Sequence, residues 1–120
     1  MKDDSVYLNH NVNCIAKIQE NTAQGYEEFR ASHTLQDAVL RNLQVLAEST
    51  QRLSDTAKAA EPDIEWSEIG AYRNVLVHDY LGIDLDAVWD ITQKDLPKLA
   101  KAVKAILLRL SGCGGSQTSL

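Results

Sequence analysis

Apolar residues recur every three or four positions along most of this chain, from Asp4 to about Thr22, from Thr34 to about Lys58, from Trp66 towards Tyr80, and after Pro97. This spacing places them on one face of an α-helix. No segment shows the strict apolar–polar alternation of a half-buried strand. The pattern therefore predicts an all-α protein. The positions expected to face the core are Leu8, Val12, Ile15 and Ile18; Leu35, Ala38, Val39, Leu43, Leu46, Ala47, Thr50 and Leu53; Val88, Trp89 and Ile91; and Leu99, Val103, Ile106, Leu107 and Leu110.

Turn and capping residues predict where these helices begin and end. Gly25 ends the first helix, and a single turn around Phe29 connects it to the second. Thr34, followed by Asp37 in the first turn, is the expected start of the second helix. The segment Glu61-Pro62-Asp63 then breaks the chain before the third helix.

The second half of the chain is divided in the same way. Leu81-Gly82-Ile83-Asp84 closes the third helix with a glycine, and Asp84 or Asp86 caps a short fourth helix. Asp95-Leu96-Pro97 restarts the chain, because proline is tolerated in a first helical turn and not later. We expect a single-domain antiparallel bundle of about five helices, two of them short. The domain covers residues 1–110, and residues 111–120 form a flexible tail.

Composition fits one ordinary soluble domain, with 120 residues, 44% hydrophobic and 24% charged. No apolar run approaches the roughly 20 residues that cross a bilayer, and the first residues are polar and acidic rather than a secretory signal. We therefore expect no membrane contact and a cytoplasmic location.

The net charge and the positions of the cysteines and histidines limit which ligands the protein is expected to bind. The net charge of −5 argues against broad binding to a nucleic-acid backbone, so any RNA contact would rest on a few arginines. Cys14 and Cys113 form neither a metal cluster nor a disulfide framework. His10 and His33 are interpreted as surface or capping residues. The sequence thus predicts no metal and no cofactor.

The segment RNVLVHDY, from Arg73 to Tyr80, gathers the residue types that carry chemistry, and we call it the motif segment. Arg73 offers a permanently charged planar fork for a phosphate, and His78 can exchange a proton near neutral pH. Asn74 adds an amide, and Tyr80 adds a hydroxyl that is also a possible modification site. Arg41, in the second predicted helix, is either a second cation that reaches the cleft in which Arg73 would bind a phosphate, or a solvated edge residue.

On an ideal α-helix, the side chains of Arg73 and His78 in the motif segment point in different directions. At about 100° per residue, Arg73 and Tyr80 share a face and Asn74 and His78 lie one turn apart, but Arg73 and His78 are about 140° apart. Either the helix distorts near His78, or long side chains converge, or a second copy of the chain supplies the missing partner. We favour the last arrangement, in a two-fold dimer.

The motif segment and its surroundings resemble the HEPN superfamily, specifically the HepT-like toxins of two-gene HepT–MntA modules. The match is carried by the motif in which an arginine is followed, after four residues, by a histidine and, after one more residue, by a tyrosine; here these are Arg73, His78 and Tyr80. The segments WSEIGAYRN, HDYLGID, VWDI and DLP also match. It covers most of residues 5–110.

The resemblance implies a dimer with a metal-independent ribonuclease cleft at its interface. Arg73 and His78 would be the catalytic pair, and Asn74 matches the polar residue that commonly follows the arginine. It also implies a partner, an MntA-like nucleotidyltransferase antitoxin that transfers AMP onto Tyr80.

The residues themselves permit this chemistry, because RNA can be cleaved by attack of its own 2′-hydroxyl on the adjacent phosphate. His78 suits acid–base catalysis, and Arg73 suits stabilisation of charge on phosphorus. The alternatives are a non-catalytic module that binds a nucleotide or a partner protein, with Arg73 as a phosphate clamp, and a dimerising helical scaffold.

Overall fold

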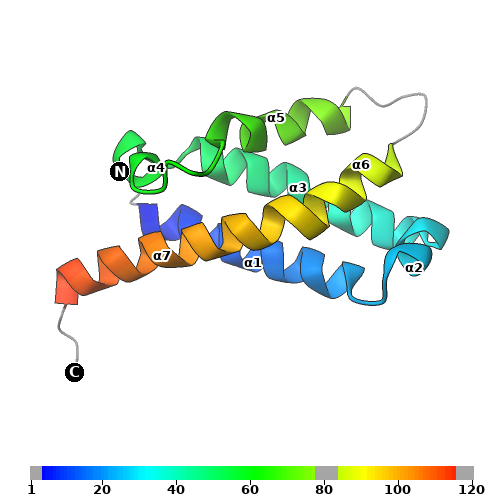
Figure 1. Ribbon diagram of the computed structural model, residues 1–120, viewed down its shortest axis with the longest axis horizontal. Coiled ribbons are helices and arrows are strands. Elements are labelled where there is room, and N and C mark those ends of the chain that lie inside the picture. The colour runs from blue at the N-terminus through cyan, green and yellow to red at the C-terminus, as the bar shows by residue number, and fades with distance from the viewer. Residues whose placement is uncertain (1–3, 78–83, 116–120) are drawn as a thin grey trace.

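The computed structural model describes the backbone of residues 4–77 and 84–115 and the side chains of residues 4–72 and 84–110. Within these ranges the chain is helical and holds no strand, which confirms the predicted all-α class (Figure 1). The motif segment is described only in part: Arg73 to Val77 have a helical backbone, whereas His78 and Tyr80 lie outside the described residues. The elements are α1 (Asp4–Thr22), α2 (Tyr26–Ala31), α3 (His33–Gln51), α4 (Asp55–Ala59), α5 (Trp66–Val77), α6 (Leu85–Asp90), the π-helix η1 (Ile91–Asp95) and α7 (Leu96–Gly115).

Helix α1 packs along α3 and α7 through the apolar face that the spacing predicted. Leu8, Ile15 and Ile18 on this face are buried. The helix ends where expected, because Gly25 adopts a φ of 103°, which a side chain would disfavour. At the other end of α1, the Asp4 carboxylate accepts hydrogen bonds from the backbone N–H and the hydroxyl of Ser54, at 2.8 and 2.6 Å.

The second predicted helix is in fact two helices, so its expected boundaries were wrong. Ser32, and not Thr34, caps α3, and its side chain accepts a hydrogen bond from the N–H of Leu35 at 3.1 Å. The helix stops at Gln51, because Ser54 offers a second cap: its hydroxyl accepts from the N–H of Ala57 and begins α4.

Helices α6, η1 and α7 run on without interruption, which corrects the predicted restart at Asp95. Leu96 donates its N–H to the carbonyl of Ile91, five residues back, as a π-helical turn requires. Pro97 lacks an N–H and its ring crowds the preceding turn, so a wider turn at this point keeps the helix continuous. Of the two caps predicted for α6, Asp84 and Asp86, it is Asp84 that caps the helix, accepting from the N–H of Ala87 at 3.0 Å.

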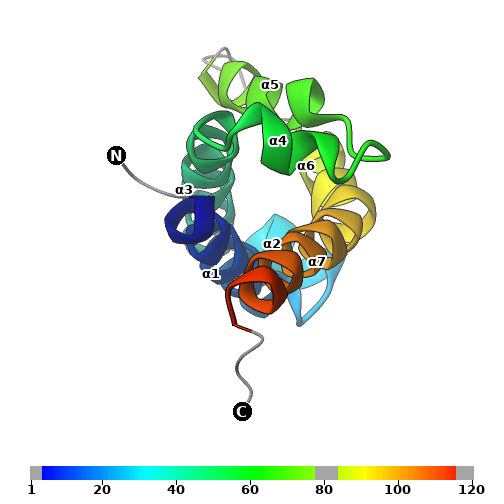
Figure 2. The ribbon, with the colours of Figure 1, turned by 90° about the vertical axis from the view of Figure 1, so that its left-hand side faces the viewer.

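The long helices surround one apolar core, as the end-on view in Figure 2 shows. Most predicted core positions are buried in it, but Leu110 is 43% exposed, because it borders an open hollow between α7 and the first turn of α1. Helix α7 extends beyond the start of α1 (Figure 1). Helix α7 also continues to Gly115, beyond the boundary expected at residue 110. No helix in the described part of the chain is both long and apolar enough to span a membrane.

Candidate active site at the end of helix α5

Helix α5 carries the described half of the motif segment on its last turns. Arg73 and Asn74 follow directly after Tyr72, and the helix packs against α3 along its length. Helix α6 begins on the other side of the undescribed residues 78–83, so the chain segments before and after His78 are both anchored to the bundle.

Tyr72 fixes the rotation of α5 next to Arg73. Its ring is 6% exposed, and its hydroxyl donates a 2.8 Å hydrogen bond to the carboxylate of Asp95 in η1. Burial, and then the hydrogen bond to Asp95, raise the pKa of Tyr72 far above its usual range. The phenol therefore stays protonated and serves as a donor that ties the motif helix to the π-helix.

The opposite side of α5 approaches α3 closely at Gly70. A Cβ atom at this position would lie 2.9 Å from Nε2 of Gln51, so the missing side chain leaves room for the Gln51 side chain of α3 to lie against α5. Within three residues of Arg73, Tyr72 thus ties α5 to η1, and Gly70 gives space to a side chain of α3 on the other side of the helix.

Helix α6 is held in place by aromatic residues of α2. The Tyr26 hydroxyl hydrogen-bonds to the carboxylate of Asp86, and this bond is the main reason that the pKa of Tyr26 is raised. The rings of Tyr26 and Phe29 both contact Trp89, with centroids 5.5 Å apart in each pair.

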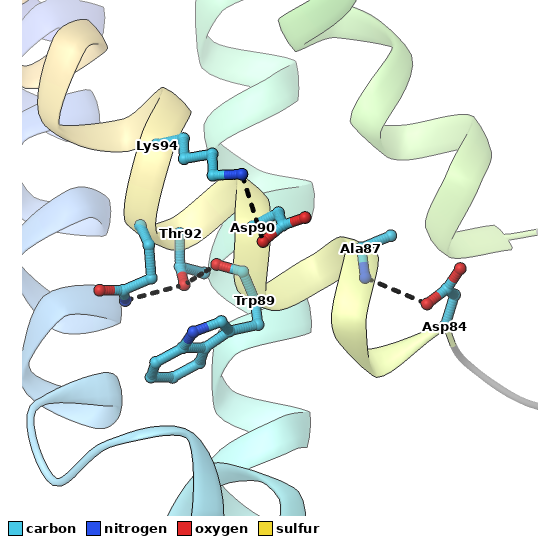
Figure 3. Close-up of polar contacts among 7 residues, drawn as sticks. Asp84, Ala87, Trp89, Asp90, Thr92 and Lys94 are labelled. Atoms are coloured by element: carbon cyan, nitrogen blue, oxygen red, sulfur yellow. Dashed lines mark hydrogen bonds and ion pairs between the residues drawn. The ribbon is translucent and has the colours of Figure 1, made fainter.

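The turn after α6 is stabilised by its own side chains (Figure 3). Buried Thr92 donates its hydroxyl to the carbonyl of Trp89 at 2.7 Å, one turn back. Exposed Lys94 lies 3.8 Å from Asp90 in a solvated ion pair. These contacts keep η1 in the register that presents Asp95 to Tyr72.

The other side chains considered from the sequence lie elsewhere. Arg41, His10 and His33 are all exposed. Cys14 is buried, and burial raises the pKa of its thiol. Among the described side chains, no three of His, Cys, Asp and Glu are grouped so as to hold a metal ion.

Tyr72 and Asp95 were missed as partners of the site by reasoning from the sequence. Tyr72 lies three positions after buried Ile69 and therefore on the inner side of α5, which was the available signal. Its partner was hidden, because Asp95 was interpreted as the residue before a helix start, and π-helical register has no simple sequence signature.

Comparison of the sequence with known protein families identifies the family of this chain. Residues 12–106 match the family model described as "Ribonuclease HepT-like", a range that contains the whole motif segment. No solved structure shows significant similarity to the chain.

Curated relatives point the same way. A "Gamma-glutamylcyclotransferase and putative RNase" of Methanocaldococcus jannaschii is 34% identical over 110 residues, which are 91% of this chain and 50% of that protein. A "Putative RNase" of Caldanaerobacter subterraneus subsp. tengcongensis is 30% identical over 89% of this chain and 96% of its own length. A "Probable ribonuclease HepT" of Thermococcus cleftensis is 31% identical over 78% of this chain and 86% of its own length. The chain spans half of the first of these proteins and most of the other two, and it belongs to the HepT-like ribonuclease family.

Proposed function

We propose that this protein is a metal-independent endoribonuclease and the toxin of a toxin–antitoxin module, with Arg73 and His78 as its catalytic pair. The observation that carries the proposal is the family match across residues 12–106, which includes an intact Arg73-Asn74 and His78-Asp79-Tyr80. The anchoring of α5 by Tyr72 supports it, because a phosphate-binding arginine acts best from a rigid element.

Cleavage proceeds by transfer of the phosphoryl group within the RNA. The 2′-oxygen attacks the adjacent phosphorus, the bond from phosphorus to the 5′-oxygen breaks, and the products are a 2′,3′-cyclic phosphate and a 5′-hydroxyl. His78 moves the proton, a role worth about 10²–10⁴-fold in rate. Arg73 stabilises the charge that develops on the phosphoryl oxygens, and removing such a donor costs on the order of 10²–10³-fold. Asn74, one turn before His78, orients the imidazole or the substrate.

The site needs two copies of the chain. Positions 73 and 78 differ by about 140° around a straight helix, so one helix does not aim both groups at a single phosphate. A two-fold dimer that brings the ends of two α5 helices together supplies Arg73 from one subunit and His78 from the other.

Tyr80 is the point of control. An MntA-like nucleotidyltransferase transfers AMP from ATP to the phenol oxygen of Tyr80, with pyrophosphate as the leaving group. The added phosphate is negatively charged and competes with RNA for Arg73. On a helix that continued past Val77, positions 73 and 80 would share one face. Mass spectrometry after co-expression with the cognate transferase is expected to place AMP on Tyr80, and an unchanged level of modification in Tyr80→Phe would refute the assignment.

One cleavage assay tests the nuclease. The purified chain is incubated with end-labelled RNA in EDTA beside Arg73→Ala and His78→Ala. Arg30→Ala and His10→Ala, both at exposed positions, are the matched controls for the loss of an arginine or a histidine. We expect cleavage by wild type and both controls, and products that end in a cyclic phosphate. RNA that binds but is never cut would instead indicate a non-catalytic binding module.

A further inference from the structure

A polar groove lies beside α5, on the N-terminal side of Arg73. It has a volume of about 430 Å³ and is lined by Gln51, Lys58, Trp66, Ser67, Gly70 and Ala71, and we call it the α5 groove. This volume falls within the range of pockets that bind small molecules, roughly 300–1,000 Å³. Three elements contribute to it, namely α3, α4 and α5.

The groove is distinguished from the other hollows by its charge. Its lining contains the ammonium group of Lys58 and no carboxylate, in a chain whose net charge is −5. The small hollow between α5 and η1 is lined by Asp63, Glu65, Glu68 and Asp95 together with Lys98, and the hollow between α1 and α7 contains both Lys104 and Asp4. Of these three, the α5 groove is therefore the one suited to an anionic ligand.

Its lining also offers groups that suit a base and a ribose. The indole N–H of Trp66 donates to the carbonyls of Lys58 and Glu61, at 3.0 and 3.2 Å, which fixes a half-buried aromatic ring in the wall. Exposed Gln51 and Ser67 present an amide and a hydroxyl, and Gly70 exposes no side chain that would fill the space. An aromatic ring, hydrogen-bonding groups and a cation are the elements with which proteins bind single-stranded nucleic acid.

The side of α5 that lines the groove can be followed towards the motif segment by helical position. With Gly70 set at 0°, the helical positions of Trp66 and Ala71 fall at about −40° and +100°, and they define the groove side of the helix. Position 74 falls inside this arc, at about 40°, and position 73 falls at its edge, at about −60°. A strand that leaves the proposed active site along α5 would reach the groove within about one helical turn.

We propose that the α5 groove is a second nucleotide-binding subsite, which holds a nucleotide of single-stranded RNA next to the phosphodiester that Arg73 contacts. This rests on the proposed ribonuclease function. Lys58 pairs with a backbone phosphate and Trp66 contacts the base or ribose. The subsite makes the enzyme favour longer RNA over a dinucleotide, because a dinucleotide does not extend into the groove.

Binding measurements separate this subsite from catalysis. Fluorescence anisotropy is used to titrate wild type with a 2′-O-methyl oligonucleotide of about ten residues, which lacks the attacking hydroxyl and is not cut. In Lys58→Ala we expect the Kd to rise about 2–5-fold and the slope of log Kd against log salt to fall by about 0.7. Lys101→Ala removes an exposed lysine from α7 and is the matched control, with Kd and salt slope unchanged.

A second pair of variants introduces a charge into the groove at constant side-chain size. Ala71 is exposed, so both Ala71→Glu and Ala71→Gln are tolerated on the helix surface. We expect Ala71→Glu to weaken binding of the oligonucleotide at least about fivefold relative to Ala71→Gln, through repulsion of the phosphate. Cleavage of a dinucleotide is expected to be equal in the two variants.

The outcomes distinguish the two proposals. Equal binding by Lys58→Ala, Lys101→Ala and wild type, together with equal binding by the two Ala71 variants, would overturn the subsite even if RNA is cut. Loss of dinucleotide cleavage in Ala71→Glu would also count against it, because the charge would then be acting on the active site. RNA that is bound in the groove but never cut would leave the subsite standing and refute the ribonuclease.

Discussion

The hydrogen bond between Tyr72 and Asp95 provides the sharpest test of how this fold positions the motif helix. Replacing Tyr72 by Phe keeps the ring that packs in the core and removes only the hydroxyl that donates at 2.8 Å. The loss therefore reports on the bond itself, with little effect from a cavity.

The magnitude follows from the two groups. A hydrogen bond to a charged partner is typically worth about 1.5–3 kcal/mol. Asp95 is exposed and recovers water when the phenol is lost, so we expect the free energy of unfolding to fall by about 1–2 kcal/mol. For a chain of 120 residues, the melting temperature falls by about 3–10 °C.

Urea unfolding followed by circular dichroism gives the stability, and a double-mutant cycle isolates the pair. Asp95→Ala is expected to cost about as much as Tyr72→Phe, and the double variant to cost little more than either, which gives a coupling of about 1 kcal/mol. Asp95→Asn retains an acceptor oxygen and is expected to keep most of the stability. A coupling below about 0.3 kcal/mol would show that the bond does not fasten α5 to η1. If RNA cleavage is confirmed, kcat is expected to follow the same order of variants.

Three further results are expected. Asn11 is fully buried, and its side-chain nitrogen and oxygen have no hydrogen-bond partner among the described residues. Asn11→Leu is therefore expected to raise the free energy of unfolding by about 1–3 kcal/mol. A lower stability of Asn11→Leu in urea would show that the amide has a partner outside the described residues. Ser54→Ala removes both a helix cap and the hydrogen bond from the Ser54 hydroxyl to Asp4, while the backbone N–H of residue 54 still donates to Asp4. It is expected to cost about 1–2 kcal/mol in thermal unfolding, more than Ser32→Ala, which removes a cap alone; an equal cost would refute a contribution from the contact between the hydroxyl and Asp4. The pKa of Tyr72 is raised in the folded state, so above about pH 10 only the unfolded state loses this proton, and the free energy of unfolding falls with rising pH. In Tyr72→Phe the free energy of unfolding is expected to fall less steeply with rising pH. Identical curves for the two proteins would contradict the raised pKa of Tyr72.

Helix type and core faces could be predicted from the sequence because they depend on local spacing. Leu8, Ile15 and Ile18 recur at helical intervals and are buried as predicted. The cap of α6 was narrowed to Asp84 or Asp86 for the same reason, since an aspartate that accepts from the N–H three residues later acts within one turn, and Asp84 is the one that does so.

Features that depend on competing or distant groups were beyond this reasoning. Both Ser32 and Thr34 are good caps, and only the path of the chain after α2 decides between them. Leu110 has the spacing of a core residue, but it is exposed because it borders an open hollow between α7 and the first turn of α1. The same holds for the candidate site. Its chemistry could be predicted from the residue types and spacing within the motif segment, whereas the hydrogen bond between Tyr72 and Asp95, which lie 23 positions apart, could not.

The π-helical turn gives the protein a constraint on helical phase. Its extra residue rotates everything after η1 by about 100° relative to α6. Trp89, before the turn, faces the aromatic residues of α2, and Asp95, at its end, faces Tyr72. Deleting one residue between them would restore an ordinary α-helix, but it would then allow only one of these two contacts to form. Natural variation in chain length at Ile91–Asp95 is therefore expected to be rare unless the anchoring of α5 changes with it.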